Sequence, residues 1–160
     1  MRLGILSDTH DQVARTAAAV ALLVAEGAEA LVHCGDLTGP AVVRACAALP
    51  CHYVLGNNDF DEDALRRAIA ATGGVFLGRG GELRLEGRRL AVTHGDSARE
   101  VRRLAAARPD YLLLGHSHVP ADARDGPTRR INPGALHRAA RWSVALLDLP
   151  NDTLRFLDVR

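Results

Sequence analysis

The sequence predicts an α/β fold in which two β-sheets pack face to face and are flanked by helices. In the first half, apolar runs alternate with amphipathic helical segments, which is typical of strands joined by right-handed crossovers in a mostly parallel sheet. In the second half, strand patterns follow one another through short turns, as in hairpins. The chain of 160 residues can bury one sizeable core and shows no internal linker, so a single domain over residues 1–160 is expected.

Each predicted strand of the first half is followed by a helix. Local signals mark the helices: Gly27 lies near the end of the first, Pro40 opens the second, and acidic residues occupy the first turn of the third. The predicted strands cover residues 2–8, 30–36 and 51–59, and the helices cover 12–27, 40–49 and 61–74.

The second half is predicted to be richer in strands. Apolar and polar residues alternate before Gly87, which favours a hairpin that turns near this glycine. In chain order, the predicted elements are a hairpin over 82–96, a helix at 97–109, a strand at 111–119, the segment 128–134 with an Asn-Pro-Gly turn, and a hairpin over 141–159 that turns at Pro150, Asn151 and Asp152.

The composition excludes several classes of protein. All 20 cationic residues are arginines, so the chain has neither a Schiff-base lysine nor a phosphate-loop lysine. The net charge of +1 is too small to provide the electrostatic attraction that stable binding of long nucleic acid requires. No apolar stretch approaches the roughly 18 residues of a membrane span, and the first apolar run is too short for a secretory signal. A cytoplasmic protein with no membrane partner is therefore expected.

Short polar clusters follow five of the apolar runs. Ligands of open α/β sheets bind beyond the carboxyl ends of the strands, where such clusters would converge. Three cysteines without CxxC spacing indicate neither a disulfide framework nor a structural zinc site, so thiolates are not expected there. The five clusters are Ser7–His10, Gly35–Asp36, Gly56–Asp59, His94–Asp96 and Gly115–His118.

These clusters carry the donors of a metal site. Carboxylate, imidazole and amide groups without a thiolate suit Mn, Fe, Co, Ni or Zn. Seven donors exceed the needs of one ion, whereas two ions that share a bridging carboxylate would use them all. The donors are Asp8, His10, Asp36, Asn57, His94, His116 and His118.

The spacing of the histidines suggests how they are presented. On extended backbone, residues two apart point to the same side, so His116 and His118 are expected to face one site while Ser117 turns away. Asp8 and His10 repeat this spacing. Each motif alone also has a structural explanation, because Asp-x-His occurs in turns and caps and Gly-Asn-Asn-Asp is a common turn sequence. Their joint occurrence at the same ends of predicted strands favours the metal centre.

The motif set resembles the signature of the calcineurin-like metallophosphoesterases over the whole chain. The motifs are Asp8-x-His10, Gly35-Asp36, Gly56-Asn57, Thr93-His94-Gly95-Asp96 and Gly115-His116-Ser117-His118. The short chain and the turn at 132–134 are similar to the small bacterial and archaeal phosphodiesterases of the YfcE type. The resemblance implies a four-layer α/β/β/α sandwich of two mixed β-sheets, the metallo-dependent phosphatase fold. It places one metal ion on Asp8, His10, Asp36 and His118, and the other on Asp36, Asn57, His94 and His116, with Asp36 as the bridge.

The resemblance also implies an activity. It indicates a phosphodiesterase that hydrolyses a P–O bond with a hydroxide bridging two divalent ions, with Mn²⁺ favoured over Ni²⁺, Zn²⁺, Fe²⁺ or Co²⁺. The expected substrate is a small phosphodiester or nucleotide-like compound, and the expected assembly is a homo-oligomer, a dimer or a tetramer.

Two alternatives stay open: a phosphomonoesterase or nucleotide pyrophosphatase with the same site, and a non-catalytic scaffold on the same fold. Scaffolds of this kind typically lose a motif histidine, whereas every ligand position is occupied here.

One position departs from the family pattern. Many larger relatives carry a histidine that assists the leaving group after the ligand asparagine, where this chain has Asn58. An amide is no general acid near pH 7, so the hypothesis is that the enzyme favours diesters with good leaving groups or uses another donor. Asp59 is expected either to orient Asn58 or a ligand histidine, or to cap the following helix.

The other titratable residues are assigned mainly to structure. The predictions are His33 and Cys34 in the core, His52 at the surface, His137 either at the surface or on the substrate side, and Arg99, Arg102 and Arg103 on a solvated helix face.

Overall fold

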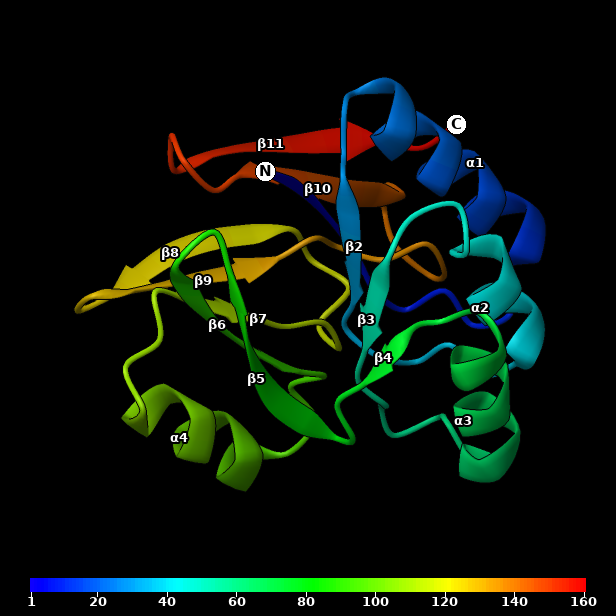
Figure 1. Cartoon of the computed structure of the whole chain (residues 1–160), viewed down its shortest axis with the longest axis horizontal. Coiled ribbons are helices and arrows are strands. Elements are labelled where there is room, and N and C mark those ends of the chain that lie inside the picture. Colours follow the sequence, from blue (N-terminus) through cyan, green and yellow to red (C-terminus); the bar gives the residue numbers. More distant parts are fainter.

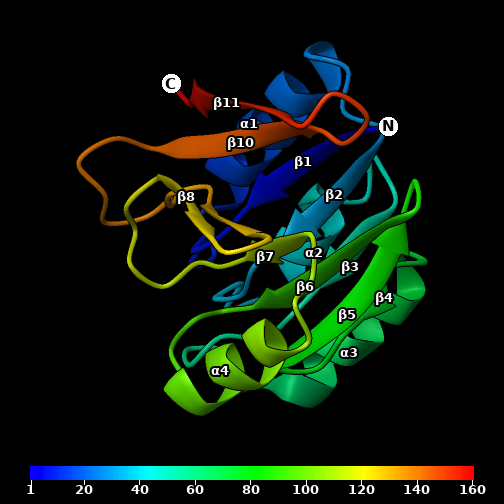
Figure 2. The ribbon, with the colours of Figure 1, turned by 90° about the vertical axis from the view of Figure 1, so that its left-hand side faces the viewer.

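The computed structural model describes residues 1–160 and confirms the predicted α/β fold of two mixed sheets flanked by helices. Three helices cover the outer side of one sheet and a fourth covers the outer side of the other, which gives four layers (Figures 1 and 2). The helices are α1 (Val13–Ala25), α2 (Pro40–Ala45), α3 (Glu62–Ala71) and α4 (Ala98–Ala106). None of them combines the length and apolarity that crossing a membrane requires.

The first sheet has six strands in the order β11-β10-β1-β2-β3-β4. The strands β1 to β4 are parallel, as the helical crossovers predict, and the antiparallel β10–β11 hairpin extends the sheet beside β1. The two-residue strand β4 was not predicted, because so short a segment carries no periodic pattern. The bounds are β1 (Arg2–Leu6), β2 (Ala30–His33), β3 (Cys51–Tyr53), β4 (Val75–Phe76), β10 (Ser143–Asp148) and β11 (Thr153–Asp158).

The second sheet has five strands in the order β5-β6-β7-β9-β8. The predicted hairpin forms β5 and β6, and β6, β7 and β9 are parallel to one another. The edge strand β8 was missed because its sequence, Ala-Asp-Ala-Arg-Asp, contains no large apolar, aromatic or β-branched residue, and all five residues are exposed. The bounds are β5 (Gly80–Leu85), β6 (Arg88–Thr93), β7 (Tyr111–Leu113), β8 (Ala121–Asp125) and β9 (Thr128–Asn132).

Three apolar layers hold the four structural layers together. Neighbouring residues of β2 illustrate the arrangement: Leu31 packs among α1, α2 and α3, whereas Val32 packs between the two sheets. Leu104 of α4 packs on Ala91 and Leu112 of the second sheet. Because the central strands are buried on both faces, they present continuous apolar runs in the sequence.

A network of charged side chains ties the β10–β11 turn to the second sheet. Asp152 of that turn accepts hydrogen bonds from the Tyr111 hydroxyl at 2.8 Å and the Arg129 guanidinium at 2.7 Å, and it also pairs with Arg124. Arg129 donates two further hydrogen bonds to Asp122, both at 2.8 Å. Burial alone would raise the pKa of Asp152, but the hydrogen bonds from these three partners outweigh it and lower the pKa to about 2.

This network should make the stability of the fold sensitive to acid. An unfolded aspartate has a pKa of about 3.9, so the Asp152 carboxylate contributes stability above that value and loses it as pH falls toward 2. We expect the unfolding free energy to fall more steeply between about pH 4 and pH 2 in the wild type than in Asp152→Asn. Urea denaturation at a series of pH values measures both slopes, and equal slopes would contradict this assignment.

Candidate metal centre

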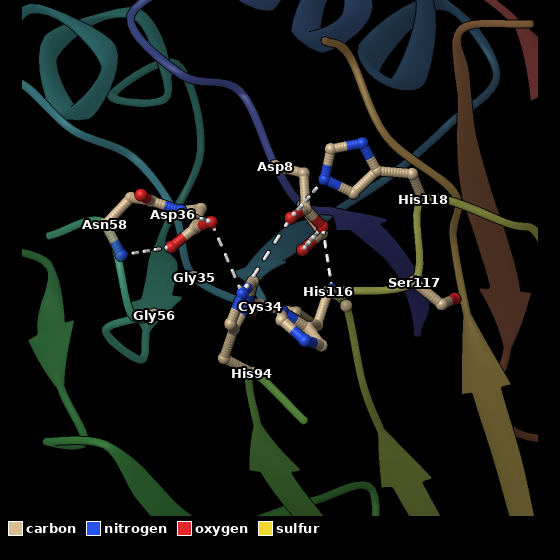
Figure 3. Close-up of polar contacts among 12 residues, drawn as sticks. Asp8, Cys34, Gly35, Asp36, Gly56, Asn58, His94, His116, Ser117 and His118 are labelled. Atoms are coloured by element: carbon tan, nitrogen blue, oxygen red, sulfur yellow. Dashed lines mark hydrogen bonds and ion pairs between the residues drawn. The ribbon is translucent and has the colours of Figure 1, made fainter. Parts of the chain in front are cut away.

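Loops from both sheets converge beyond the carboxyl ends of five strands. The loops after β1, β2 and β3 come from the first sheet, and those after β6 and β7 come from the second. Backbone hydrogen bonds join neighbouring loops within each sheet: the Asp8 N–H donates to the Gly35 carbonyl, and the Gly115 N–H donates to the His94 carbonyl. The predicted convergence of polar clusters is therefore present, and Figure 3 shows their side chains turned toward one another.

Asp36 lies between two of the predicted ligand histidines. Its Oδ2 atom is 3.3 Å from Nε2 of His10 and 3.4 Å from Nε2 of His94. The side chain of Asp36 is almost completely buried. A carboxylate in this position can reach two adjacent cations, each held on its other side by a different histidine.

Asp8 forms the second acidic point of the site. Its Oδ1 atom is 3.1 Å from Nε2 of His118 and 3.8 Å from Nε2 of His94. Its Oδ2 atom accepts hydrogen bonds from the Ser7 hydroxyl at 2.6 Å and from the His116 backbone N–H at 3.0 Å. One carboxylate oxygen is thus fixed by the protein, while the other faces the histidines.

Two of the histidines are oriented by backbone carbonyls. Nδ1 of His94 lies 2.8 Å from the Cys34 carbonyl, and Nδ1 of His118 lies 3.2 Å from the Arg138 carbonyl. A carbonyl only accepts hydrogen bonds, so Nδ1 carries the proton in both rings and Nε2 is left to act as a donor atom toward a metal. This arrangement is usual for histidines that bind metal ions.

The site contains buried polar atoms that no protein group satisfies. Oδ1 of Asp8, Nε2 of His10 and Nε2 of His94 are buried without a hydrogen-bond partner. Buried polar atoms in native proteins are nearly always satisfied, so such a cluster fits a position that binds an ion or a water molecule. Two groups of donors, each with its ligand atoms within 4.8 Å of one another, fit a metal ion: Asp8, His10 and His118, and Asp8, Asp36 and His94.

The electrostatics of the site also favour a cation. Burial by itself would lower the pKa of His94, but the Asp36 carboxylate 3.4 Å from its Nε2 and the charge of Asp8 raise the pKa to about 9. Burial would raise the pKa of Asp36, but the nearby His94 ring and the hydrogen bonds from Asn58 lower it below its usual range. The buried carboxylates therefore draw a proton onto His94, and a bound metal ion would have to displace it.

The backbone of the ligand segments differs from the prediction. The strands end at Leu6 and Leu113, so Asp8, His10, His116 and His118 lie in loops and not on extended backbone. All four have positive φ angles, between 42° and 67°. The expectation of a shared strand face is therefore wrong, although Ser117 does turn away from the carboxylates in Figure 3.

The two histidines of this segment accordingly have different neighbours. The ring of His116 lies beside that of His94, with 5.1 Å between the ring centres. His118 faces Asp8 instead. His116 is largely exposed, whereas His94 is fully buried.

The two asparagines after Gly56 occupy different positions. Asn57 is exposed and lines a cavity of about 310 Å³ that also contains His10, Asp36 and His118. Asn58 contacts Asp36 directly: its backbone N–H donates to Oδ1 at 2.9 Å, and its side-chain amide donates to Oδ2 at 2.7 Å. The amide at position 58 therefore positions a carboxylate.

Asp59 organises the loops that carry these residues. Its buried carboxylate accepts hydrogen bonds from the backbone N–H groups of Asp36 at 2.9 Å, Thr38 at 2.7 Å and Gly56 at 2.8 Å. It does not cap α3, because the side chain at the N-cap belongs to Asp61, which accepts from the Ala64 N–H. Asp59 thus fixes the loop after β2 against the loop after β3.

His33, at the end of β2, connects the loop after β1 with the loop after β2. Its Nδ1 accepts a hydrogen bond from the Gly35 N–H at 3.2 Å, so its Nε2 carries the proton and donates to the Thr9 hydroxyl at 3.1 Å. The Thr9 hydroxyl then donates to the Asp36 carbonyl at 3.3 Å. Burial lowers the pKa of His33 to about 3, so the ring stays neutral. The structural role predicted for His33 agrees with this position, whereas no role was predicted for Thr9, although it lies within the cluster Ser7–His10.

The segment after the Asn-Pro-Gly turn forms the rim of the site. The ring of His137 lies 4.9 Å from the ring of His10, and both His137 and Arg138 line the 310 Å³ cavity. Arg138 was not singled out from the sequence, in which the preceding Asn-Pro-Gly turn was the only local signal.

His52 differs from its prediction as a surface residue: it is half-buried on β3, and its Nδ1 atom has no hydrogen-bond partner.

Known proteins match this chain along nearly all of its length. Residues 1–152 match the sequence model of the calcineurin-like phosphoesterase superfamily domain. Phosphodiesterase MJ0936 of Methanocaldococcus jannaschii is 25% identical over 143 residues, which cover 84% of this chain and 83% of that protein. Phosphodiesterase YfcE of Escherichia coli K12 is 27% identical over 151 residues, which cover 85% of this chain and 79% of that protein.

A solved structure has the same fold as this chain. It is described as a novel archaeal phosphodiesterase and matches with a TM-score of 0.90 at 23% identity, covering 99% of this chain and 100% of that one. The predicted family is therefore confirmed by sequence and the predicted fold by structure. This protein belongs to the calcineurin-like phosphoesterase superfamily of enzymes.

Proposed function

We propose that the protein is a metal-dependent phosphodiesterase with two divalent ions bridged by Asp36. The observation that supports this most strongly is the placement of Asp36 Oδ2 within 3.4 Å of Nε2 of both His10 and His94, two nitrogens that have no hydrogen-bond partner. In this proposal Asp8, His10, Asp36 and His118 would hold one ion, and Asp36, Asn57, His94 and His116 would hold the other.

Bound ions of this kind act as Lewis acids on phosphoryl oxygens and lower the pKa of water toward 7, so hydroxide is available at neutral pH. The protein residues supply position and charge. Asn58 and Asp59 hold Asp36 and its loop in place, and Arg138 is one of the residues that line the cavity. No protein nucleophile is needed, which suits a site built from carboxylates, imidazoles and amides.

A diester substrate is proposed over a monoester. Both MJ0936 and YfcE are named phosphodiesterases, and this chain has Asn58 at the position where a general acid would assist poor leaving groups. The side-chain amide of Asn58 is already committed to Asp36. The non-catalytic scaffold is disfavoured because the predicted ligand residues are all present and several of their donor atoms lack a partner.

Metal removal and replacement test this function. Chelated protein is expected to lose hydrolysis of bis(p-nitrophenyl) phosphate and to regain it on addition of a divalent ion. We propose Mn²⁺ first, because the donors are oxygen and nitrogen without thiolate, and Ni²⁺, Zn²⁺, Fe²⁺ and Co²⁺ as the comparison series. p-Nitrophenyl phosphate in the same assays separates diesterase from monoesterase. Hydrolysis that persists after verified metal removal would refute the proposal.

The two neighbouring asparagines provide a matched test of the ligand set. Asn57→Ala is expected to reduce bound metal from two ions per chain to one, because it removes a direct ligand. Asn58→Ala is expected to keep both ions but to weaken their affinity by about 10- to 100-fold, as changes in groups that orient a ligand do. Metal titration by calorimetry measures both. Loss of an ion in Asn58→Ala alone would reassign the ligand to that residue.

A further inference from the structure

A second, larger hollow adjoins the metal site. It has a volume of about 570 Å³ and lies between the start of α4, the strands β8 and β9, and the loop that carries His116. His116 lines both this hollow and the 310 Å³ cavity that contains His10, Asp36 and His118. A group bound in the larger hollow would therefore begin beside one of the proposed ligands.

The hollow arises from the way α4 covers the second sheet. The helix packs over β5 and β6, and its Leu104 reaches Leu112 of β7. The strands β9 and β8 continue the sheet past β7, and the hollow lies between residues of these strands and the start of the helix; Figure 2 shows β8 and α4 at separate places on this sheet. Ala121 and Ala123 of β8 form part of the wall, and their small side chains keep the hollow open.

The lining combines apolar surface with positive charge. Six of its 13 residues are hydrophobic, among them Val101, Leu114 and Ile131, and none is acidic. The Arg102 guanidinium makes no hydrogen bond and no ion pair, and Arg130 has only a distant pair with Asp125 at 3.9 Å. Arg102 was predicted to be a solvated surface residue; it is exposed, but it also lines this hollow.

We propose that this hollow, which we call the substituent cavity, binds an aromatic or nucleoside-sized organic group attached to the phosphate that the metal site holds. The inference rests on the proposed function, because the phosphate is what joins the two cavities. A volume of about 570 Å³ falls within the usual range for small-molecule sites. The apolar walls suit a flat ring, and an unpaired guanidinium adds cation–π attraction and offsets the negative charge of the substrate.

Two non-hydrolysable ligands test this proposal without catalysis. Phenylphosphonate and methylphosphonate share one head group and differ only in the organic substituent. Burying a phenyl ring is worth about a 10- to 100-fold gain in affinity, so phenylphosphonate is expected to bind the metal-loaded enzyme more tightly by that factor. Calorimetry at a pH where both ligands are dianions gives the ratio of the two Kd values.

Substitutions then locate the binding of the ring. Ala123→Trp should fill the substituent cavity and bring the Kd ratio close to one while leaving the methylphosphonate Kd unchanged, and Ala123→Leu should have an intermediate effect. Ala106→Trp is the matched control, because Ala106 is an exposed residue of α4 that does not line the cavity. Arg102→Gln should reduce the ratio by about 2- to 5-fold.

The outcomes separate this inference from the proposed function. If neither phosphonate binds in a metal-dependent way, the proposed function fails. If both bind with equal affinity to the wild type, or if Ala123→Trp leaves a large ratio intact, only the substituent cavity is refuted. An unchanged ratio together with an altered oligomeric state in Ala123→Trp would instead show that the hollow is a contact between copies of the chain.

Discussion

Asp36→Asn is expected to abolish metal-dependent hydrolysis. The substitution keeps the size of the side chain but removes the charge that lies between His10 and His94. Metal ions contribute several kcal/mol of transition-state stabilisation, which corresponds to a loss of about 1,000-fold or more when the bridge is lost. The measurement is kcat/KM for bis(p-nitrophenyl) phosphate, together with the metal content of the purified variant.

Asp96→Asn provides the matched control for this substitution. Asp96 belongs to the loop after β6 that presents His94, but its side chain is exposed and it belongs to neither group of candidate metal donors. We expect its activity and metal content to match the wild type. The metal-free forms of both variants should unfold at temperatures close to that of the metal-free wild type, which separates loss of the bridge from loss of the fold. Substantial activity in Asp36→Asn would contradict the bridging role.

Asp59→Ala is expected to weaken both the fold and the metal site. The substitution leaves the buried N–H groups of Asp36, Thr38 and Gly56 without an acceptor. Each unsatisfied buried donor costs about 1–3 kcal/mol, so the unfolding free energy should fall by several kcal/mol. Because the loops of Asp36 and Asn57 lose their common anchor, metal affinity should fall by about 10- to 100-fold.

The neighbouring aspartate gives the control for this prediction. Asp61→Ala removes the N-cap of α3, which should cost about 1 kcal/mol of stability and leave metal affinity unchanged. Asp59→Asn retains one carbonyl oxygen and should fall between the wild type and Asp59→Ala. Urea denaturation and metal titration give the two readouts. A drop in stability of Asp59→Ala without any change in metal affinity would show that Asp59 supports the fold alone.

The location of the site could be predicted from the sequence for a physical reason. The polar clusters directly follow apolar strands, and parallel strands of one sheet end at the same edge, so Asp8 and Asp36 after two strands of the first sheet were expected to meet. His94 was expected to join them because the second sheet packs face to face with the first. The helices could be placed because their ends carry local signals such as Pro40 and the acidic first turn of α3. Strands without such signals, β4 and β8, were missed.

The detailed geometry depends on long-range contacts that spacing does not reveal. The prediction for His116 and His118 assumed a continued strand, whereas the chain leaves the sheet at Leu113 and adopts positive φ angles at both histidines. The contact between Asn58 and Asp36 and the rim position of Arg138 likewise depend on how separate loops meet. The hollow beside α4 depends on the offset between that helix and an edge strand that the sequence did not indicate.

The most direct test of the two-metal centre is anomalous diffraction from crystals of the Mn²⁺-loaded protein. We expect two manganese peaks about 3.5–4 Å apart, with the carboxylate of Asp36 bound to both, His10 bound to one and His94 bound to the other. A single peak, or two peaks of which Asp36 touches only one or neither, would contradict the account.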